Sequence, residues 1–289
     1  TFNATSISQE DYKTESLSYE INLAGARLAK NVCEEITAKN PSKPRFVCGA
    51  IGPTNKTASM SPDVSNPGFR NIDFDQLVES YMEQAKGLYD GGVDLFLIET
   101  VFDTLNCRAA LYAIQTFFGE TGKKIPVMVS GTITDASGRL LSGQTVDAFW
   151  HSIRHMDLVA VGLNCALGAE QIRPYIDTLS KIADTNILVY PNAGLPNEFG
   201  EYDQSPHDMS GYLSEFSDSG LVNIVGGCCG TEPDHIKKIS DDIIGKLPRI
   251  IPKTNSYTRL SGLEALVISP ERNFVNIGER TNVTGSSIF

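Results

Sequence analysis

The segment VDLFLIET (93–100) is an apolar run that ends in two polar residues, Glu99 and Thr100, and is followed by a helical pattern. Runs of the same kind occur at 45–52, 125–132, 158–165, 186–193 and 222–229. Because each run is apolar nearly throughout, rather than alternating with polar residues, the runs predict parallel strands that are covered on both faces.

Amphipathic patterns follow the strand-like runs and predict helices over 75–89, 103–118, 168–182 and 231–244. The first places four apolar side chains on one helical face, those of Leu77, Tyr81, Ala85 and Leu88. Asp103 suits the N-cap of the second helix. In the last, Thr231 and Asp234 resemble a capping box, and Pro233 suits the first turn.

Six strand–helix units predict a parallel α/β protein, either a closed barrel or a doubly wound sheet. The glycine-rich loop of a dinucleotide-binding fold follows none of the strands, which favours the barrel. A (β/α)8 TIM barrel takes about 250 residues, and the repeating units end near residue 247. We therefore expect a (β/α)8 TIM barrel over residues 1–250 that lacks its first strand in this chain, with residues 1–5 as a candidate end of another strand.

The composition of the sequence changes after the last strand–helix unit. Residues 251–272 are predicted to be a linker, because the chain from Leu247 onward is rich in proline and polar residues. Residues 273–289 (NFVNIGERTNVTGSSIF) begin with another strand-like run. We assign them to the first strand of a following domain and expect them to lie outside the core of the barrel.

Composition narrows the classes of function. The chain has 289 residues, of which 41% are hydrophobic, enough to bury a substantial core. Its formal charge of −11 argues against a surface for nucleic-acid phosphates or anionic lipid. No apolar run reaches the roughly 18 residues of a membrane span. Six cysteines are too few for a disulfide scaffold in a chain of this length, so we expect a cytoplasmic protein with reduced thiols.

Three of the six cysteines stand at the ends of predicted strands, Cys165 after one strand and Cys228 and Cys229 after another. In a parallel barrel these ends face a common mouth, and the glycines on both sides of the vicinal pair let its side chains turn inward together. Three thiolates in one place suit Zn2+ and leave a fourth position open for a substrate. The other cysteines are interpreted as small core residues, namely Cys33, Cys48 and Cys107.

The chemistry of such a site favours a thiol substrate. A metal-bound thiol is deprotonated, whereas zinc that already carries three thiolates polarises a bound water only weakly. The predicted site therefore suits alkyl transfer to sulfur better than hydrolysis.

Polar residues at the strand ends are candidates for binding the rest of a substrate. Three carboxylates suit a cationic group such as the ammonium of an amino acid, those of Glu99, Asp103 and Asp135. Groups suited to a carboxylate are found at Ser130, Gly131 and Thr132. The candidate set also includes Thr100, Asn164 and Asn192.

Structural interpretations compete with several of these assignments. Asp103 equally suits a helix N-cap, Asn192 a turn in YPNAGLP, and Glu99 an exposed strand end. The histidines fall on predicted helices or loops and are interpreted as structural or solvated, namely His151, His155, His207 and His235.

Four motifs together resemble the homocysteine methyltransferase family: SGTITDASGRLLSGQT (130–145), GLNCALG (162–168), YPNAGLPN (190–197) and GGCCGT (226–231). The resemblance extends over nearly the whole chain, from FNATSI (2–7) to NFVNIGERTNVTGS (273–286), and within the family it is strongest to the cobalamin-dependent methionine synthases. It implies that Cys165, Cys228 and Cys229 bind zinc, that the zinc holds the homocysteine thiolate, and that Glu99 contacts the amino-acid end of homocysteine.

The resemblance also implies a methyl donor and partner domains. Methylcobalamin would supply the methyl group to give methionine, and methylcobalamin and methyltetrahydrofolate would be bound by other domains of the same polypeptide. The alternative enzyme is a betaine-dependent or other cobalamin-independent homocysteine methyltransferase, in which the segment 273–286 is not expected. Outside enzymes, the alternatives are a zinc-storage module and an inactive barrel that serves as an interaction platform.

Overall fold

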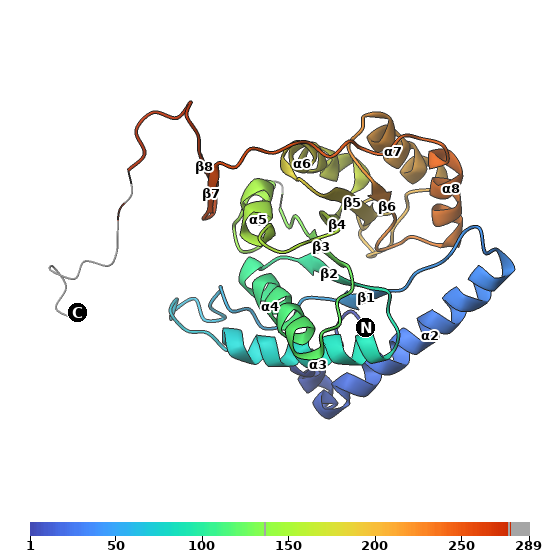
Figure 1. Cartoon of the computed structure of the whole chain (residues 1–289), viewed down its shortest axis with the longest axis horizontal. Coiled ribbons are helices and arrows are strands. Elements are labelled where there is room, and N and C mark those ends of the chain that lie inside the picture. The colour runs from blue at the N-terminus through green and yellow to red at the C-terminus, as the bar shows by residue number, and fades with distance from the viewer. Residues whose placement is uncertain (136, 277, 279–289) are drawn as a thin grey trace.

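The computed structural model describes residues 1–135, 137–276 and 278 (Figure 1). One sheet contains six parallel strands, paired in the order in which they occur along the chain. They are β1 (Cys48–Ile51), β2 (Leu95–Val101), β3 (Val127–Gly131), β4 (Ala160–Gly168), β5 (Asn186–Asn192) and β6 (Ile224–Val225). Every strand overlaps a predicted run, so the predicted parallel α/β fold is confirmed. A doubly wound sheet would reverse its strand order at a switch point, whereas the sequential order found here is that of a TIM barrel.

Helices connect consecutive strands and pack on one face of the sheet (Figure 1). Those between or after the strands are α3 (Phe74–Asp90), α4 (Thr104–Thr121), α5 (Val146–Ile153), α6 (Ala169–Ile182), α7 (Pro206–Asp218) and α8 (Pro233–Ile243). Before β1 lie α1 (Ser6–Gln9), the short turns η1 (Glu10–Tyr12) and η2 (Glu15–Leu17), and the long α2 (Ser18–Lys39). None of the described helices is both long and apolar enough to cross a membrane.

The helix starts follow from side chains that satisfy free backbone N–H groups. The Asp103 carboxylate accepts hydrogen bonds from the backbone of the first turn of α4, as its N-cap position predicts. The capping box predicted at Thr231 and Asp234 is wrong, because the Thr231 hydroxyl donates instead to the Cys228 carbonyl at 2.7 Å. Glu232 and His235 form the box at the start of α8.

Alternate residues of the strands face opposite sides of the sheet. In β2, Phe96 and Ile98 join the large core between the sheet and the helices. Leu97 faces the other way and packs in a smaller cluster with residues of the neighbouring strands, namely Met128, Ala160, Leu188 and Tyr190. This second apolar layer explains why the strands are apolar on both faces.

Residues 1–5, the candidate end of a further strand, lie beside β1 without forming a regular strand in this structure. The Gly52 backbone N–H donates to the Phe2 carbonyl at 3.0 Å, and the Thr1 hydroxyl donates to the Ala50 carbonyl at 3.0 Å. Within the described residues, β1 and β6 are the outer strands of the sheet.

Arg249 anchors the chain where the barrel units end. Its side chain is buried, and its guanidinium donates to three backbone carbonyls, those of Ser180, Ala183 and Thr185, at 2.6 to 3.0 Å. Its own backbone N–H donates to the Val222 carbonyl at 3.0 Å. The chain therefore remains part of the barrel through residue 249.

The segment 251–272, predicted to be a linker, contains an antiparallel hairpin of β7 (Thr258–Ser261) and β8 (Ala265–Ile268). Beyond it, Phe274 is exposed over 88% of its surface. The strand predicted at the start of residues 273–289 is not formed over 273–276, where the backbone is irregular, whereas residues 277 and 279–289 lie outside the described residues. The assignment of this segment to a following domain stays a prediction, as do the domain boundaries.

Candidate metal centre

Cys165 is held in place by an irregular end of β4. The register with β5 shifts between Asn164 and Gly168, and Cys165 and Ala166 both have positive φ angles, 60° and 55°. Such angles are costly for residues other than glycine, and they persist only where the surrounding structure enforces them. The irregular end turns the Cys165 side chain out of the strand pattern.

Cys228 and Cys229 follow β6 and are fixed by β5. The Cys228 backbone N–H donates to the Pro191 carbonyl at 2.8 Å, and the Cys229 carbonyl accepts from Ala193 at 2.9 Å. The Cys229 N–H also donates to the side-chain oxygen of Asn192 at 3.2 Å. The end of β5 thus aligns both members of the vicinal pair.

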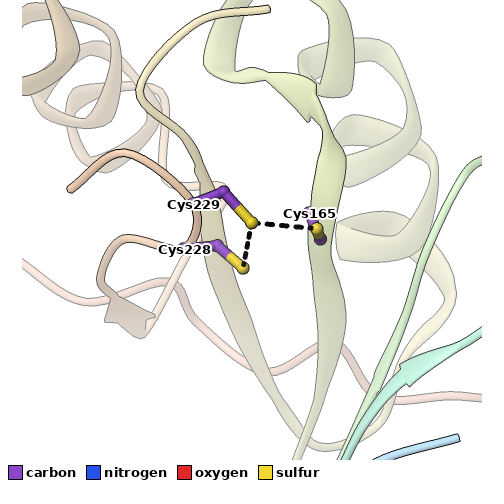
Figure 2. A group of neighbouring side chains, drawn as sticks. All are labelled: Cys165, Cys228 and Cys229. Atoms are coloured by element: carbon purple, nitrogen blue, oxygen red, sulfur yellow. Dashed lines mark hydrogen bonds between the residues drawn. The ribbon is translucent and has the colours of Figure 1, made fainter. Parts of the chain in front are cut away.

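The three sulfur atoms converge at the carboxyl ends of the strands (Figure 2). All lie within 4.8 Å of one another. The Cys229 sulfur is 3.6 Å from that of Cys165 and 3.9 Å from that of Cys228. A tetrahedral zinc ion with Zn–S bonds of about 2.3 Å separates its sulfur ligands by about 3.8 Å. Cys229 is exposed and the other two are half-buried, so the cluster is open to a fourth ligand.

The protonation of the cluster favours one thiolate and opposes a second. Hydrogen bonding by Cys228, aided by the Ala166 backbone, lowers the pKa of Cys165 to about 5. The pKa of Cys228 is raised by its hydrogen bond to Cys165 and by burial, and that of Cys229 is raised by burial and the charge of Cys165. A bound cation would remove this mutual repulsion, so the donor set fits a metal ion.

Asn164 links the cluster to the neighbouring strands. It is fully buried, and its amide nitrogen donates to the Cys228 sulfur at 3.8 Å and to the Thr100 hydroxyl at 2.9 Å. Its oxygen accepts from the Thr100 backbone at 3.1 Å and from the Ser130 hydroxyl at 2.7 Å. These bonds hold Thr100 at its positive φ of 57°.

Comparison with known proteins agrees with this geometry. Residues 1–243 match the family model described as homocysteine S-methyltransferase.

The chain belongs to the homocysteine S-methyltransferase family.

Similar solved structures include the homocysteine methyltransferase MmuM from Escherichia coli in oxidised and metallated forms, each with a TM-score of 0.66 and 20% identity. Each match covers 83% of this chain and 76% of the other. The apo form of the same protein matches with a TM-score of 0.61 over 78% of this chain and 74% of that one. At this identity the likeness shows the fold, and it agrees with the TIM barrel predicted from the sequence.

The structure separates the three carboxylates that the sequence proposed for an ammonium group. Glu99 accepts a hydrogen bond from the Tyr190 hydroxyl at 3.2 Å, and burial raises its pKa. Asp103 is buried and occupied as the cap of α4. Asp135 is exposed and accepts from the Ser137 backbone within its own loop at 2.8 Å. Among the contacts of the described residues, only Glu99 of these three carboxylates is joined by a hydrogen bond to a strand that borders the sulfur cluster.

The remaining predicted residues divide between the cluster and the loop after β3. Thr100, Ser130, Asn164 and Asn192 belong to the hydrogen-bond network just described. Gly131 packs against Phe149, and the buried Thr132 hydroxyl has no hydrogen-bond partner among the described residues.

Two tyrosines near the centre were missed by the sequence analysis. Tyr190 stands inside an apolar run, where an aromatic residue indicates only core packing, yet its hydroxyl reaches Glu99. Tyr202 packs on Gly230, and burial and the neighbouring Cys229 raise its pKa. Its loop carries no pattern that would have identified it.

Proposed function

We propose that this chain binds homocysteine through a zinc ion held by Cys165, Cys228 and Cys229 and prepares its thiol for methylation to methionine. The observation that carries the proposal is the convergence of three cysteine sulfurs at the carboxyl ends of the strands, within 4.8 Å of one another. Membership of the family indicates homocysteine as the substrate. The exposed side of the cluster leaves room for the homocysteine sulfur.

The donor set suits zinc better than a metal that prefers oxygen ligands. Thiolates are soft donors that select zinc over magnesium or calcium. When bound, zinc would keep the homocysteine thiol deprotonated near neutral pH without removing its nucleophilic character. The structurally similar MmuM has been solved in a metallated form, which supports a test for metal binding by this chain.

The protein groups around the cluster would orient the amino-acid end of homocysteine. Glu99 is the carboxylate that we assign to the ammonium, because Asp103 and Asp135 already accept hydrogen bonds from their own backbone segments. Ser130, Gly131 and Thr132 remain our candidates for the carboxylate, and the Thr132 hydroxyl is the proposed donor because it has no hydrogen-bond partner among the described residues. The Ser130 hydroxyl and the Thr132 backbone N–H already donate to Asn164 and Val101. Thr100, Asn164 and Asn192 would act by holding these groups and the sulfurs in position.

Zinc coordination is the direct test. We would measure zinc per chain, then record X-ray absorption at the zinc edge with and without homocysteine. The proposal expects one zinc with three sulfur neighbours and a fourth sulfur when homocysteine is present. Zinc whose ligands do not change with homocysteine would contradict it.

The methyl donor is proposed to be methylcobalamin, delivered by another domain, with methyltetrahydrofolate bound by a further one. The support is the segment 273–286, which is similar to the opening of a methyltetrahydrofolate-binding domain. Free methylcobalamin and betaine, each supplied with saturating homocysteine, distinguish the alternatives. Methylation from betaine and not from methylcobalamin would overturn this assignment while leaving the zinc site intact.

A further inference from the structure

The hairpin of β7 and β8 lies against α5 and the loop 132–145 that connects β3 to α5, of which residues 132–135 and 137–145 are described (Figure 1). The Thr145 backbone N–H donates to the Leu263 carbonyl at 3.0 Å. The Ser261 hydroxyl donates to the Ala148 carbonyl at 2.6 Å. The hairpin is therefore attached to the barrel at both the loop and the helix that follows it.

A second group of contacts attaches the hairpin to the interior of the loop. Arg139 forms an ion pair with Glu264, and the same guanidinium donates to the Gly143 carbonyl at 2.8 Å. The Leu263 side chain packs on Gly143. Because Gly143 has a φ of 88°, a conformation that suits glycine, the loop closes tightly under the turn of the hairpin.

Gln144 joins the hairpin, the loop and the start of α4. Its side chain is nearly buried, and its amide nitrogen donates to the Gly262 carbonyl at 2.8 Å. Its side-chain oxygen accepts from the Thr104 hydroxyl, and its backbone carbonyl accepts from Leu140 at 3.0 Å. One side chain thus uses both its donor and its acceptor to hold three segments together.

These three segments are connected to the sulfur cluster through residues 99–104. The Ser142 backbone N–H donates to the Phe102 carbonyl at 3.0 Å, and that of Thr132 donates to the Val101 carbonyl at 2.9 Å. Thr100, two residues before Phe102, is bound by Asn164, which also donates to the Cys228 sulfur. Residues 99–104 therefore lie between the cluster on one side and the Gln144 contacts on the other.

We propose that the hairpin 258–268 is a strap that, through the positioning residue Gln144, holds residues 99–104 and the loop 132–145 in the arrangement that binds the amino-acid end of homocysteine. The inference rests on the proposed function. The three cysteines come from β4 and the segment after β6, so loosening the strap weakens homocysteine binding and leaves zinc in place.

Two variants isolate the donor of Gln144. In Gln144→Glu the side chain still accepts from Thr104 but no longer donates to Gly262, whereas Gln144→Ala loses both contacts. Ser261→Ala removes the hairpin's hydroxyl contacts with Ala148 and Ser152 and the 3.4 Å contact from Gln144. Ser256→Ala, an exposed serine of the same segment, is its matched control. Each variant is measured as the full chain loaded with zinc.

Three measurements decide the inference: zinc per chain, the Kd of homocysteine by titration calorimetry, and amide hydrogen exchange. We expect Gln144→Glu to raise the Kd about tenfold, the size of effect that the loss of one buried hydrogen bond has, with zinc unchanged. Exchange should rise in 140–145 and 261–263 but not in β5, and Ser256→Ala should match the parent. An unchanged Kd overturns the inference.

Hydrogen exchange also separates this inference from the proposed function. A parent chain that carries zinc but binds no homocysteine would refute the proposed function. The strap itself is then decided by exchange alone, and unchanged exchange over 140–145 in Gln144→Glu would refute it.

Discussion

The two ends of the six-stranded sheet are held by different kinds of contact. Where β5 and β6 begin, Arg249 donates to backbone carbonyls, and the Asn186 amide donates to the Val159 carbonyl at 2.8 Å. Where the strands end, Thr100 and Cys165 have positive φ angles, and a buried Asn164 joins two strands to a cysteine sulfur. At one end backbone carbonyls are satisfied by buried or half-buried side chains, whereas at the other end strained residues surround the three cysteines.

The difference between the two ends of the sheet indicates which end contributes to stability and which end is suited to binding. Backbone strain is retained where the surrounding structure enforces it, and it concentrates at binding sites. In barrels of this kind the carboxyl ends of the strands carry the chemistry and the opposite ends carry stability. Substitutions at the two ends should therefore affect different measurements.

The largest effect is expected from the cysteines. Replacing Cys228 or Cys229 with Ala removes one of three sulfur donors, so stoichiometric zinc and homocysteine-dependent activity should both be lost. The barrel should stay folded, because its core lies on the strands and helices rather than on the cluster. Zinc analysis beside circular dichroism checks both points. The matched control is Cys107→Ala, which replaces a buried cysteine of α4 outside the cluster. This variant should bind as much zinc as the parent.

Asn164 sharpens the comparison within the carboxyl ends. Asn164→Ala removes the donor to the Cys228 sulfur and leaves the Thr100 N–H without its acceptor. Loss of such an outer-shell partner costs about 10–100-fold in metal affinity. Competition with a zinc chelator measures the change. The control is Asn186→Ala, because Asn186 is the first residue of β5 and lies at the amino end of the sheet. An equal loss of zinc affinity in Asn186→Ala would contradict the distinction between the two ends of the sheet.

Arg249 tests the opposite end. Arg249→Met leaves the carbonyls of Ser180, Ala183 and Thr185 without their donor in a buried place. We expect a loss of about 2–4 kcal/mol in the free energy of unfolding, with zinc affinity unchanged. Denaturant unfolding measures this loss of stability. The control is Arg108→Met, a substitution at an exposed arginine of α4, which should change the free energy of unfolding by less than about 0.5 kcal/mol. A weaker zinc site in Arg249→Met would contradict the assignment.

The sequence alone predicted the strands, the cysteine cluster and the helices observed as α3, α4, α6 and α8, because these depend on local patterns. It gave no ranges for α1, α2, α5 and α7. Apolar runs of strand length and polar residues at their ends are visible without knowing how strands pair. Once parallel pairing is inferred, the strand ends meet at one edge, and Cys165 falls beside Cys228 and Cys229.

The parts that the sequence could not predict depend on partners distant in the chain. Tyr190 meets Glu99 from 91 residues away, and Gln144 meets Gly262 from 118 residues away. The hairpin was missed because its strands are short and its turn has no Asn-Gly or Asp-Gly signature. Asn164 was assigned to substrate, whereas its amide is occupied by Thr100, Ser130 and the Cys228 sulfur.

The smallest effect is expected at Glu99, and it has opposite signs in two measurements. Burial raises the pKa of Glu99, although the hydrogen bond from Tyr190 partly offsets this. A carboxyl whose pKa is higher in the folded than in the unfolded chain destabilises the fold as pH rises through that pKa. Glu99→Gln should therefore be slightly more stable than the parent at neutral pH, and the difference should shrink as pH falls. Homocysteine should nevertheless bind more weakly, because its ammonium loses a charged partner. Unfolding at neutral and acidic pH measures the change in stability, and titration calorimetry measures homocysteine binding. The control is Glu120→Gln, at an exposed carboxylate on α4, which should change neither quantity. A variant that binds homocysteine as tightly as the parent would show that Glu99 is a half-buried strand-end residue and not a substrate contact.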